Sequence, residues 1–549
     1  MSAEQVIEQI LRQRGIGAGD REQFLGPDFE HDTHAPELML GMGVAVDRLV
    51  TAVAESEQVV VFGDYDADGV PATALLTRGL RALGLTVTSI IPTRSSGYGL
   101  SAAVVEQITA TGTRLLITVD NGTVAKEEIA ALNEAGVAVI VCDHHQPLEG
   151  QLAPALAILN PKQPDCPYPF KELCGCAIAW KLLWSLYATV GRDPASLKWE
   201  LDLVALSTVA DMVPLVGENR VLVQFGLKVM RKSRNQGLQA LVAAAGLQLA
   251  AVGPGDIGFR LGPRINAPSR MHQDTVAGQN PSLALLLSEQ PAEAESWAEH
   301  LSTCNTARQD LLERQVREAV EEAEHYLPDM CLVLYRPDWS SGVIGLLAGR
   351  LLERYRRPVV VLAPEEGEVK GSVRSVEGVG VVELLDSACE LFSRFGGHAK
   401  AGGLTLAGGE SVVPVLRARL NHHLREQGVT LEQLALAMKR TPDLELSLSE
   451  ADLPLAEALQ QLEPFGIGFP EPIFRTTATL IAPRGVGREG KHLSCFLDQA
   501  GVRRKAIGFG LAAESFQSGD QVQVDFTLQA EEYRGVRSAS CCIQSMVLV

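Results

Sequence analysis

The sequence contains neither a hydrophobic run long enough to cross a membrane nor the pattern of a secretory signal. No stretch reaches the ~18 consecutive apolar residues that a membrane helix needs. The start, MSAEQVIEQILRQRG, lacks a basic segment followed by an apolar run and a cleavage site. Cysteines are also few, ten in 549 residues, and are scattered in apolar surroundings, which argues against a disulfide framework. We therefore expect a cytoplasmic protein that does not contact a membrane.

Basic residues are scarce as well. Against 67 acidic residues stand 48 Lys and Arg, giving a formal net charge of −19. Because proteins bind polyanions by neutralising phosphates with Lys and Arg, this composition disfavours nonspecific attraction to nucleic acid. Internal repeats and low-complexity tracts are absent, and 46% hydrophobic residues suffice for a buried core. At roughly 100–200 residues per domain, the length predicts about three globular units.

Apolar runs alternate with helical segments in the first half of the chain. The runs VVVFG, VTSIIP, LLITVD and VAVIVCD, separated by segments such as ATALLTRGLRALG, predict a parallel sheet covered on both faces. Residues 291–326 begin with Pro and have helical spacing, which predicts one long connecting helix. CLVLY and PVVVLAP predict a second α/β unit with loops KGSVRS and FGGHAKAGG, and alternating runs after about residue 440 predict a small antiparallel β-barrel or sandwich.

These patterns divide the chain into five parts. We expect a lead-in, a parallel-sheet domain with a helical extension, a connecting helix, a second α/β domain and a β-barrel domain, over residues 1–45, 46–287, 288–328, 329–435 and 436–549. The extension includes FRLGPRINAPSRM, which we expect to be a loop.

Acidic and imidazole side chains follow or close apolar, strand-like runs of the first domain, including LVALSTVA before Asp211. They are Asp64, Asp66 and Asp68 in GDYDADG, Asp120 in VDNG, Asp143, His144 and His145 in CDHH, and Asp211 in VADMVP. Because the carboxyl ends of parallel strands meet at one edge of a sheet, we expect these side chains to lie close together. Oxygen and imidazole donors suit Mn²⁺ or Mg²⁺, and two such ions about 3.5–4 Å apart can support phosphodiester hydrolysis. One such Asp alone would equally be a turn or helix cap, but the combination favours a two-metal site.

The four motifs resemble, in order, those of the DHH phosphoesterase superfamily. Further stretches resemble its RecJ family, namely IPTRSSGYGLS, LGPRINAPSRM, GSVRS, FGGHAKAGG, FPEPIF and EEYRGVRS. The resemblance implies a DHH domain, a DHHA1 domain over 329–435 and a nucleic-acid-binding OB-fold over 436–549. It also implies a single-stranded-DNA-specific exonuclease that uses two divalent ions, releases 5′-mononucleotides from the 5′ end and serves DNA repair and recombination. A single-stranded-DNA-binding protein and a helicase are the partners that it implies.

The resemblance also implies a role for each site residue. It assigns Asp66 and Asp64 to one metal, Asp68, His144 and Asp211 to the other, and Asp120 to both. It implies that His145 faces the scissile phosphate and that Asp143 orients an imidazole. It assigns the terminal phosphate to Arg94, Ser372 and Arg374 and the path of the strand to Arg264 and Arg270. Gly397 and His398 are a candidate anion site because we expect the GGH loop to begin a helix. For any single arginine named above, an ion pair between the lobes is the alternative to phosphate binding.

Some positions depart from the family pattern. They are Ser340 and Ser341 where a histidine is usual, Pro268 and Ser269 in the APSRM loop, and Val373 in place of glycine. These departures put end preference in doubt more than hydrolysis. Cys174 and Cys176 lack a zinc-ribbon partner at suitable spacing. Three alternatives stay open: a nanoRNase or small-nucleotide phosphatase, an inorganic pyrophosphatase, and a non-catalytic replication or repair scaffold.

Overall fold

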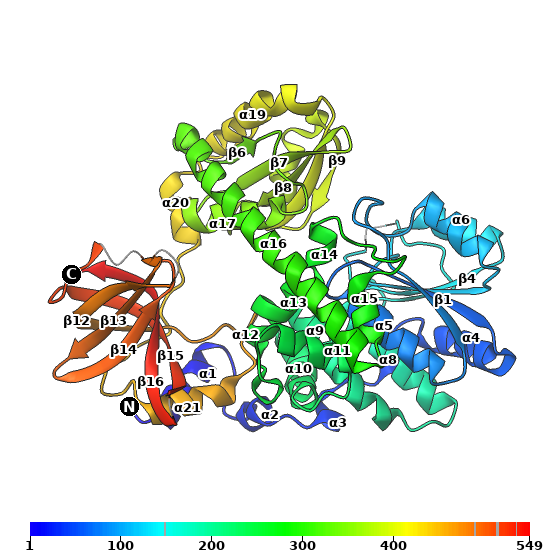
Figure 1. Ribbon diagram of the computed structural model, residues 1–549, viewed down its shortest axis with the longest axis horizontal. Coiled ribbons are helices and arrows are strands. Elements are labelled where there is room, and N and C mark those ends of the chain that lie inside the picture. Colours follow the sequence, from blue (N-terminus) through cyan, green and yellow to red (C-terminus); the bar gives the residue numbers. More distant parts are fainter. Residues whose placement is uncertain (148–149, 488–489, 512–514, 534) are drawn as a thin grey trace.

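The computed structural model describes residues 1–549 except 148–149, 488–489, 512–514 and 534 and the side chain of Tyr533. Three sheets occupy three regions of the molecule, and one long helix joins the first region to the second (Figure 1). This arrangement confirms the predicted architecture of two α/β units and a terminal β-barrel.

The first sheet is entirely parallel, in the order β2-β1-β3-β4-β5. Its strands are β1 Gln58–Gly63, β2 Thr86–Ile90, β3 Leu115–Val119, β4 Ala138–Cys142 and β5 Ala157–Leu159. Val59 and Val61 pack into the core on one face, whereas Val60 and Phe62 pack into the core on the other. Burial on both faces explains why these strands are continuously apolar.

Helices cover both faces of this sheet. On one side lie α4 Met42–Glu55, α5 Gly69–Arg81, α8 Gly175–Thr189 and α9 Leu201–Ala210. On the other lie α6 Ala102–Ala110 and α7 Lys126–Glu134. The extension adds α10 Gly217–Met230, α11 Gln236–Ala244 and α15 Pro281–Leu287.

Two expectations for this domain are wrong. The run LVALSTVA before Asp211 belongs to helix α9 and is not strand-like. Because α9 is buried around most of its circumference, its apolar run cannot be told from a buried strand by periodicity. The segment FRLGPRINAPSRM is helical and not a loop, with a π-helical turn Ile257–Leu261 followed by α13 Gly262–Ile265 and α14 Ala267–Arg270. Pro263 and Pro268 lie in the first turns of α13 and α14, where proline fits a helix.

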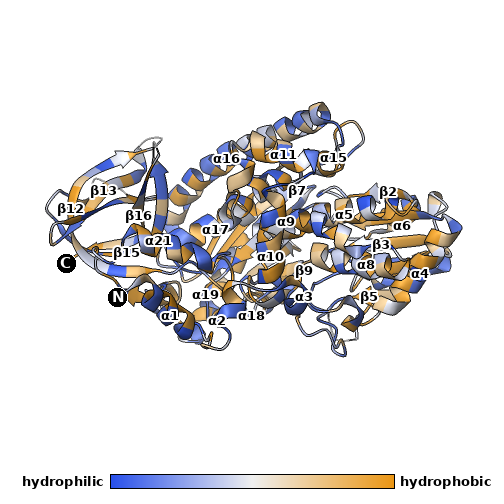
Figure 2. Ribbon diagram, turned by 90° about the horizontal axis from the view of Figure 1, so that it is seen from below, coloured by the Kyte–Doolittle hydropathy of each residue, from blue (hydrophilic) through white to orange (hydrophobic). Residues whose placement is uncertain are grey.

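The predicted connecting helix is α16, Pro291–Ala323, which mixes hydrophilic and hydrophobic residues along its length (Figure 2). It leads to a mixed sheet in the order β6-β7-β8-β10-β9. The strands are β6 Leu332–Tyr335, β7 Val359–Glu365, β8 Glu368–Arg374, β9 Phe392–Gly397 and β10 Ala401–Leu406, and the helices are α17 Ile344–Tyr355, α18 Val381–Asp386 and α19 Val413–Glu426.

The loops expected in this second unit are strands. KGSVRS lies in β8, where Val369, Gly371 and Val373 face the core and the polar residues alternate with them. FGGHAKAGG forms the β9–β10 hairpin, so the GGH motif does not begin a helix. The hairpin needs glycine at Gly397, because a Cβ there would lie 2.4 Å from the carbonyl oxygen of Ala401.

The third sheet closes into a five-stranded barrel. Its order is β12-β13-β14-β16-β15, and a pairing of β12 with β15 completes the ring. The bounds are β11 Leu444–Glu445, β12 Phe474–Val486, β13 His492–Gln499, β14 Val502–Gly508, β15 Gln521–Tyr533 and β16 Val536–Leu548. One barrel pair, β14 with β16, is parallel, so the barrel is not entirely antiparallel as predicted.

The first helix, α1 Ala3–Gln13, packs against this barrel. Val6 and Ile10 share a core with Leu455 of α21 Leu453–Leu459 and with barrel residues. The expected lead-in is therefore divided in space, because α1 lies with the barrel and α4 lies with the first sheet.

Among the described helices, none combines the length and the hydropathy that a membrane span requires. The ten cysteines are all free thiols.

Candidate metal centre and adjoining cleft

Five elements of the first domain carry the predicted acids to one edge of the sheet. Asp64, Asp120 and Asp143 directly follow β1, β3 and β4, whereas Asp68 precedes α5 and Asp211 follows α9. The turn after β3 is tight, with positive φ at Asp120 (61°) and Gly122 (106°). A Cβ on Gly122 would lie 2.6 Å from Thr118 Oγ1, which restricts this position to glycine.

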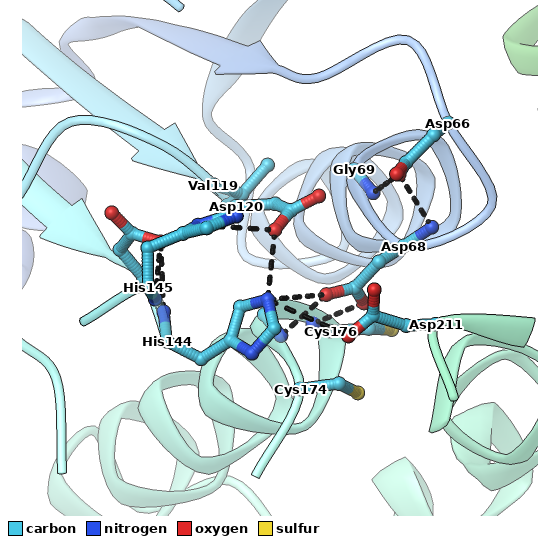
Figure 3. Close-up of polar contacts among 12 residues, drawn as sticks. Asp66, Asp68, Gly69, Val119, Asp120, His144, His145, Cys174, Cys176 and Asp211 are labelled. Atoms are coloured by element: carbon cyan, nitrogen blue, oxygen red, sulfur yellow. Dashed lines mark hydrogen bonds and ion pairs between the residues drawn. The ribbon is translucent and has the colours of Figure 1, made fainter. Parts of the chain in front are cut away.

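The side chains form three overlapping groups whose ligand atoms lie within 4.8 Å of one another. These groups are Asp64, Asp66 and Asp120; Asp68, His144 and Asp211; and Asp120, His144 and His145. His144 Nε2 lies 3.2 Å from Asp120, 3.5 Å from Asp211 and 3.8 Å from Asp68 (Figure 3). The structure therefore brings seven of the predicted residues together, and Asp120 and His144 each occur in two groups.

Backbone amides fix two of the acids. Asp68 accepts hydrogen bonds from the amides of Gly175 (2.6 Å) and Cys176 (2.9 Å). A Cβ on Gly175 would lie 2.9 Å from Asp68 Oδ2, so glycine permits this close approach. Asp66 accepts hydrogen bonds from the amides of Asp68 (2.9 Å) and Gly69 (3.1 Å), which anchors the first turn of α5.

The CGC motif thus supports the centre through its backbone. Burial and the negative charge of Asp68 raise the pKa of the thiols of Cys174 and Cys176 well above their usual range. Neutral, buried thiols are poor metal ligands, because the thiolate is the form that binds metal.

Asp143 belongs to none of the three groups. It accepts hydrogen bonds from the amides of Thr123 (3.0 Å), His144 (2.8 Å) and His145 (3.1 Å), and His145 Nδ1 lies 2.7 Å from it. Burial would raise the pKa of Asp143, but the hydrogen bond from His145 and the positive charges of the imidazoles lower it. Asp143 therefore remains ionised and orients the His145 ring.

The remaining acids repel one another. Burial, followed by the charges of neighbouring carboxylates, raises the pKa of Asp68 to about 6 and raises the pKa of Asp64, Asp120 and Asp211 well above the usual range. Asp64 Oδ1, His144 Nδ1 and Asp211 Oδ2 are buried and have no hydrogen-bond partner among the residues that the structure describes. Divalent cations would remove this repulsion, and a donor set of carboxylate oxygens and imidazole nitrogens fits Mn²⁺ or Mg²⁺.

A cleft of about 630 Å³ adjoins the centre and lies between the first domain and the mixed sheet. Four of the predicted substrate-binding residues line it: Arg94, Arg270, Ser372 and Arg374. Tyr98 joins the cleft to the metal centre, because its hydroxyl donates to the carbonyl oxygen of Asp120 (2.9 Å) and lies 3.1 Å from His145 Nδ1.

The cleft presents arginines free for an anion. Arg374 donates to Ser372 Oγ (3.1 Å) and to the carbonyl oxygen of Val373 (2.8 Å), and burial lowers its pKa. Burial and the charges of Arg94 and Arg308 lower the pKa of Arg270 to about 10. Within the described part of the chain, Arg94, Arg270 and Arg374 form no ion pair with a carboxylate. The alternative of an ion pair between the lobes therefore does not apply to these three residues.

The other predicted contacts lie outside this cleft. Arg264 donates to Ser302 Oγ (3.2 Å) and to the carbonyl oxygen of Arg260 (2.7 Å). Gly397 and His398 form the hairpin turn, where the His398 amide donates to the carbonyl oxygen of Ala401 (2.8 Å). Their neighbour Gly396 lines the cleft.

Sequence analysis missed Lys370 and Arg394, which also line the cleft. The period-two spacing of Lys370, Ser372 and Arg374 would have indicated a strand with one polar face. Lys370 forms an ion pair with Glu365, which also accepts a hydrogen bond from Ser341.

The departures from the family pattern differ in location. Ser341 lines the cleft, whereas the side chain of Val373 is buried in the core of the mixed sheet. Pro268 and Ser269 are buried within α14. Only the serine departure therefore changes the lining of the cleft.

Comparison with known proteins agrees with this arrangement. The DHH family N-terminal domain model matches residues 58–208, the DHHA1 domain model matches 329–426, and the RecJ OB domain model matches 442–545. The single-stranded-DNA-specific exonuclease RecJ of Salmonella typhimurium is 35% identical over 534 residues, covering 92% of this chain and 90% of that protein.

Two solved structures of RecJ from Thermus thermophilus are also similar. The complex with Mn²⁺ has a TM-score of 0.82 at 30% identity and covers 98% of this chain and 75% of that one. The complex with Mg²⁺ has a TM-score of 0.75 at 28% identity and covers 98% and 74% of the two chains.

A parallel-sheet domain with a rim of carboxylates and imidazoles, followed by a DHHA1 domain, defines a phosphoesterase of the DHH superfamily. The terminal OB barrel and the similarity along nearly the whole chain narrow this class. The chain belongs to the RecJ family.

Proposed function

We propose that this protein is a metal-dependent exonuclease specific for single-stranded DNA, which cleaves from the 5′ end, releases 5′-mononucleotides and serves DNA repair and recombination. The observation that carries the proposal is that the candidate metal centre opens, through Tyr98, onto a cleft whose arginines form no ion pair with any acid of the described residues. A phosphodiester can lie at the centre while the terminal phosphate lies in the cleft.

The metal ligands divide into two sets. Asp64 and Asp66 would hold one ion, Asp68, His144 and Asp211 would hold the other, and Asp120 would contact both; the grouping of their ligand atoms supports this division. Two Mn²⁺ or Mg²⁺ ions bound there would supply an activated water and would stabilise the leaving oxygen.

His145 acts on the substrate, and Asp143 acts through His145. The hydrogen bond with Asp143 engages Nδ1 and raises the pKa of His145, against the effect of burial. When it is protonated, this partly exposed imidazole beside Asp120 can donate to a phosphate oxygen or to the leaving group.

The strand end is bound by guanidinium and hydroxyl groups. Arg94, Ser372 and Arg374 bind the terminal phosphate, since a guanidinium can bind phosphate with two parallel hydrogen bonds. Arg270 and Arg264 continue the path on the first domain, and Gly397 and His398 border it on the second. In this division of roles, residues 46–287 cleave the strand, 329–435 hold its end together with Arg94, and 436–549 bind the strand beyond.

A single-stranded-DNA-binding protein and a helicase would supply this enzyme with substrate, and we place its action in the cytoplasm. The resemblance to the RecJ family implies both partners. A helicase also agrees with the chemistry of the substrate, because duplex DNA must be separated into strands before a single-strand-specific enzyme can act.

The test incubates the protein and an Asp120→Ala variant with 5′- and 3′-labelled single strands, duplexes and dinucleotides, in Mn²⁺ and in Mg²⁺. We expect immediate release of labelled mononucleotide from the 5′ label of single strands, and none from the variant. Glu127→Gln on the exposed surface of α7 is the matched control and should behave as the wild type. Cleavage confined to dinucleotides would instead indicate a small-nucleotide phosphatase.

A further inference from the structure

An apolar groove of about 570 Å³ lies between the first domain and the segment that enters the barrel. One wall consists of the end of α9, the residues that follow it and the π-helical turn, and the other consists of residues 463–471. Its apolar lining includes Met212, Val213, Phe259, Phe465, Ile467 and Pro470. The proposed cleavage and end-binding sites do not use this groove.

Large apolar side chains are unusually exposed along it. Phe259 is 85% exposed, Met212 is 66% exposed and Ile467 is 49% exposed. Exposed apolar side chains that gather in one concave place mark a binding surface more often than scattered ones do. Phe259 also projects from a π-helical turn, a feature that is frequent at functional sites.

The groove begins beside the metal centre. Met212 directly follows Asp211, and consecutive Cα atoms are about 3.8 Å apart. Met212 has a positive φ of 62°, a conformation that an unbranched L-residue adopts only where its surroundings impose it. The chain thus directs Asp211 towards His144 and the next side chain into the groove.

Interdomain contacts hold the second wall in place. The Leu215 amide donates to the carbonyl oxygen of Ile467 (2.7 Å), and Arg220 donates to the carbonyl oxygens of Leu462 (2.9 Å) and Pro464 (3.2 Å). A Cβ on Gly466 would lie 2.6 Å from Leu215, so the two segments are in close contact. The groove is therefore formed before any ligand binds.

The lining selects the chemistry of the ligand. Among the described residues that line the groove there is no Lys or Arg, while Glu463 and Glu471 contribute carboxyl groups. These carboxyl groups would repel phosphate. Nucleobases, in contrast, are flat and stack on aromatic and thioether groups, and their amino groups can donate hydrogen bonds to a carboxylate.

We propose that this groove binds bases of the single strand beyond the scissile phosphate, with Phe259 and Met212 as the stacking surfaces. The inference rests on the proposed function and deepens it, because it assigns the route by which the strand leaves the metal centre towards the barrel. The phosphodiester backbone stays outside the groove, and only the bases enter it.

The test measures binding of a 5′-phosphorylated, fluorescent 12-nucleotide strand by anisotropy, in the Asp120→Ala background so that no cleavage occurs. Adding Phe259→Leu should raise Kd between about five-fold and 100-fold, the range that loss of one base–aromatic stack gives. Phe259→Trp should restore binding. Trp199→Leu, which removes a 40%-exposed aromatic side chain elsewhere on the first domain, is the matched control and should leave Kd unchanged.

A series of strands with one abasic site each locates the contact. We expect the abasic site at one or two positions to weaken binding to the parent and to have no further effect once Phe259→Leu is present. Equal Kd values for the Asp120→Ala parent and its Phe259→Leu variant would overturn the assignment of the groove to bases. So would an abasic penalty that is the same in both proteins at every position. In either case a protein partner would be the remaining candidate ligand. Failure of the parent to bind any single strand would instead reject the proposed function itself.

Discussion

Asp120 and Asp143 are both almost fully buried, yet their carboxyl groups have opposite pKa shifts. Three backbone amides and His145 surround Asp143 with positive hydrogen-bond donors. Asp120 instead faces other carboxylates, so burial and the charge of Asp68 raise its pKa. The same residue type is thereby divided into an ionised carboxylate that orients an imidazole and a carboxyl group whose ionisation a nearby cation would favour.

A third buried acid, Asp202 on α9, makes the stability depend on pH. Burial raises its pKa from 3.8 to about 7, against a hydrogen bond from Ser233. Between these two pH values the folded protein retains a proton that the unfolded chain has released, so stability falls as pH rises through this window. Asp202→Asn, which is neutral at every pH, should raise Tm at pH 8 by about 2–4 °C and leave it nearly unchanged at pH 4.5.

Calorimetry of both proteins from pH 4.5 to 8 measures this difference. Glu127→Gln, which neutralises an exposed acid of α7, should give a pH profile parallel to the wild type. Parallel profiles for Asp202→Asn and the wild type would show that Asp202 is ionised throughout.

At the scale of elements, one glycine determines how closely the mixed-sheet domain approaches the first domain. A Cβ on Gly342 would lie 2.0 Å from the carbonyl oxygen of Arg270, a contact between two backbones that no side-chain movement can relieve. Gly342→Ala should therefore separate the two sides of the cleft and weaken binding of 5′-phosphorylated single strands at least ten-fold, as measured by anisotropy.

Gly349, seven residues further along and within α17, provides the control. A Cβ there would meet nothing within 4 Å. Gly349→Ala should keep full affinity and add about 0.5–1 kcal/mol of helix stability. Equal affinities for the two alanine variants would contradict the role of close approach at Gly342.

Arg220 of α10 joins the first domain to the barrel. It is 3% exposed, donates to three carbonyl oxygens of residues 462–464 and lies over the ring of Phe24 at 3.8 Å. Arg220→Met should leave the carbonyl oxygens of Leu462 and Pro464 without their donor, at about 1–3 kcal/mol for each one that stays buried, whereas the carbonyl of Glu463 keeps its hydrogen bond from Gln224. Hydrogen exchange at the Leu215 amide should then accelerate, because that amide bonds to the same segment. Lys228→Met, on the exposed side of α10, should leave exchange at Leu215 unchanged.

The elements that could be predicted from the sequence are those whose local hydrophobic pattern matches the burial of the element in the fold. The strands β1, β3 and β4 are buried on both faces, so their apolar runs and the acids that end them were recognisable. Helix α9 was not, because a helix buried on nearly every side has the same apolar run as a strand. Contacts between domains, such as those of Arg220, join residues more than 200 positions apart and leave no local pattern.

The same limit applies to the candidate site. The clustered acids were predictable because Asp64, Asp120 and Asp211 each directly follow a core element. The cleft was predicted only in part, since Lys370 and Arg394 reach it through the pairing of strands. The groove residues Met212 and Phe259 were not predicted, because their exposure depends on how three segments pack.

At the scale of the whole molecule, the distribution of charge matters more for binding nucleic acid than the net charge does. A net charge of −19 should repel a polyanion, yet the cleft between the first two domains collects Arg94, Arg270, Arg374 and Arg394. A cationic cleft within an acidic surface admits a strand at one place and disfavours nonspecific binding elsewhere.

This distribution predicts how salt and the terminal phosphate affect binding. In the Asp120→Ala background, affinity for a 5′-phosphorylated strand should fall steeply between 50 and 200 mM salt, since each phosphate neutralised contributes about −0.7 to the slope of log K against log salt. Arg374→Gln should weaken that binding about ten-fold and reduce the slope by roughly one phosphate, while binding of a 5′-hydroxyl strand should change little. Arg419→Gln, an exposed arginine on α19 paired with Glu390, is the control. An equal loss for both strands on Arg374→Gln would mean that Arg374 contacts the strand internally, and the end-binding role would then fall to Arg94 and Ser372.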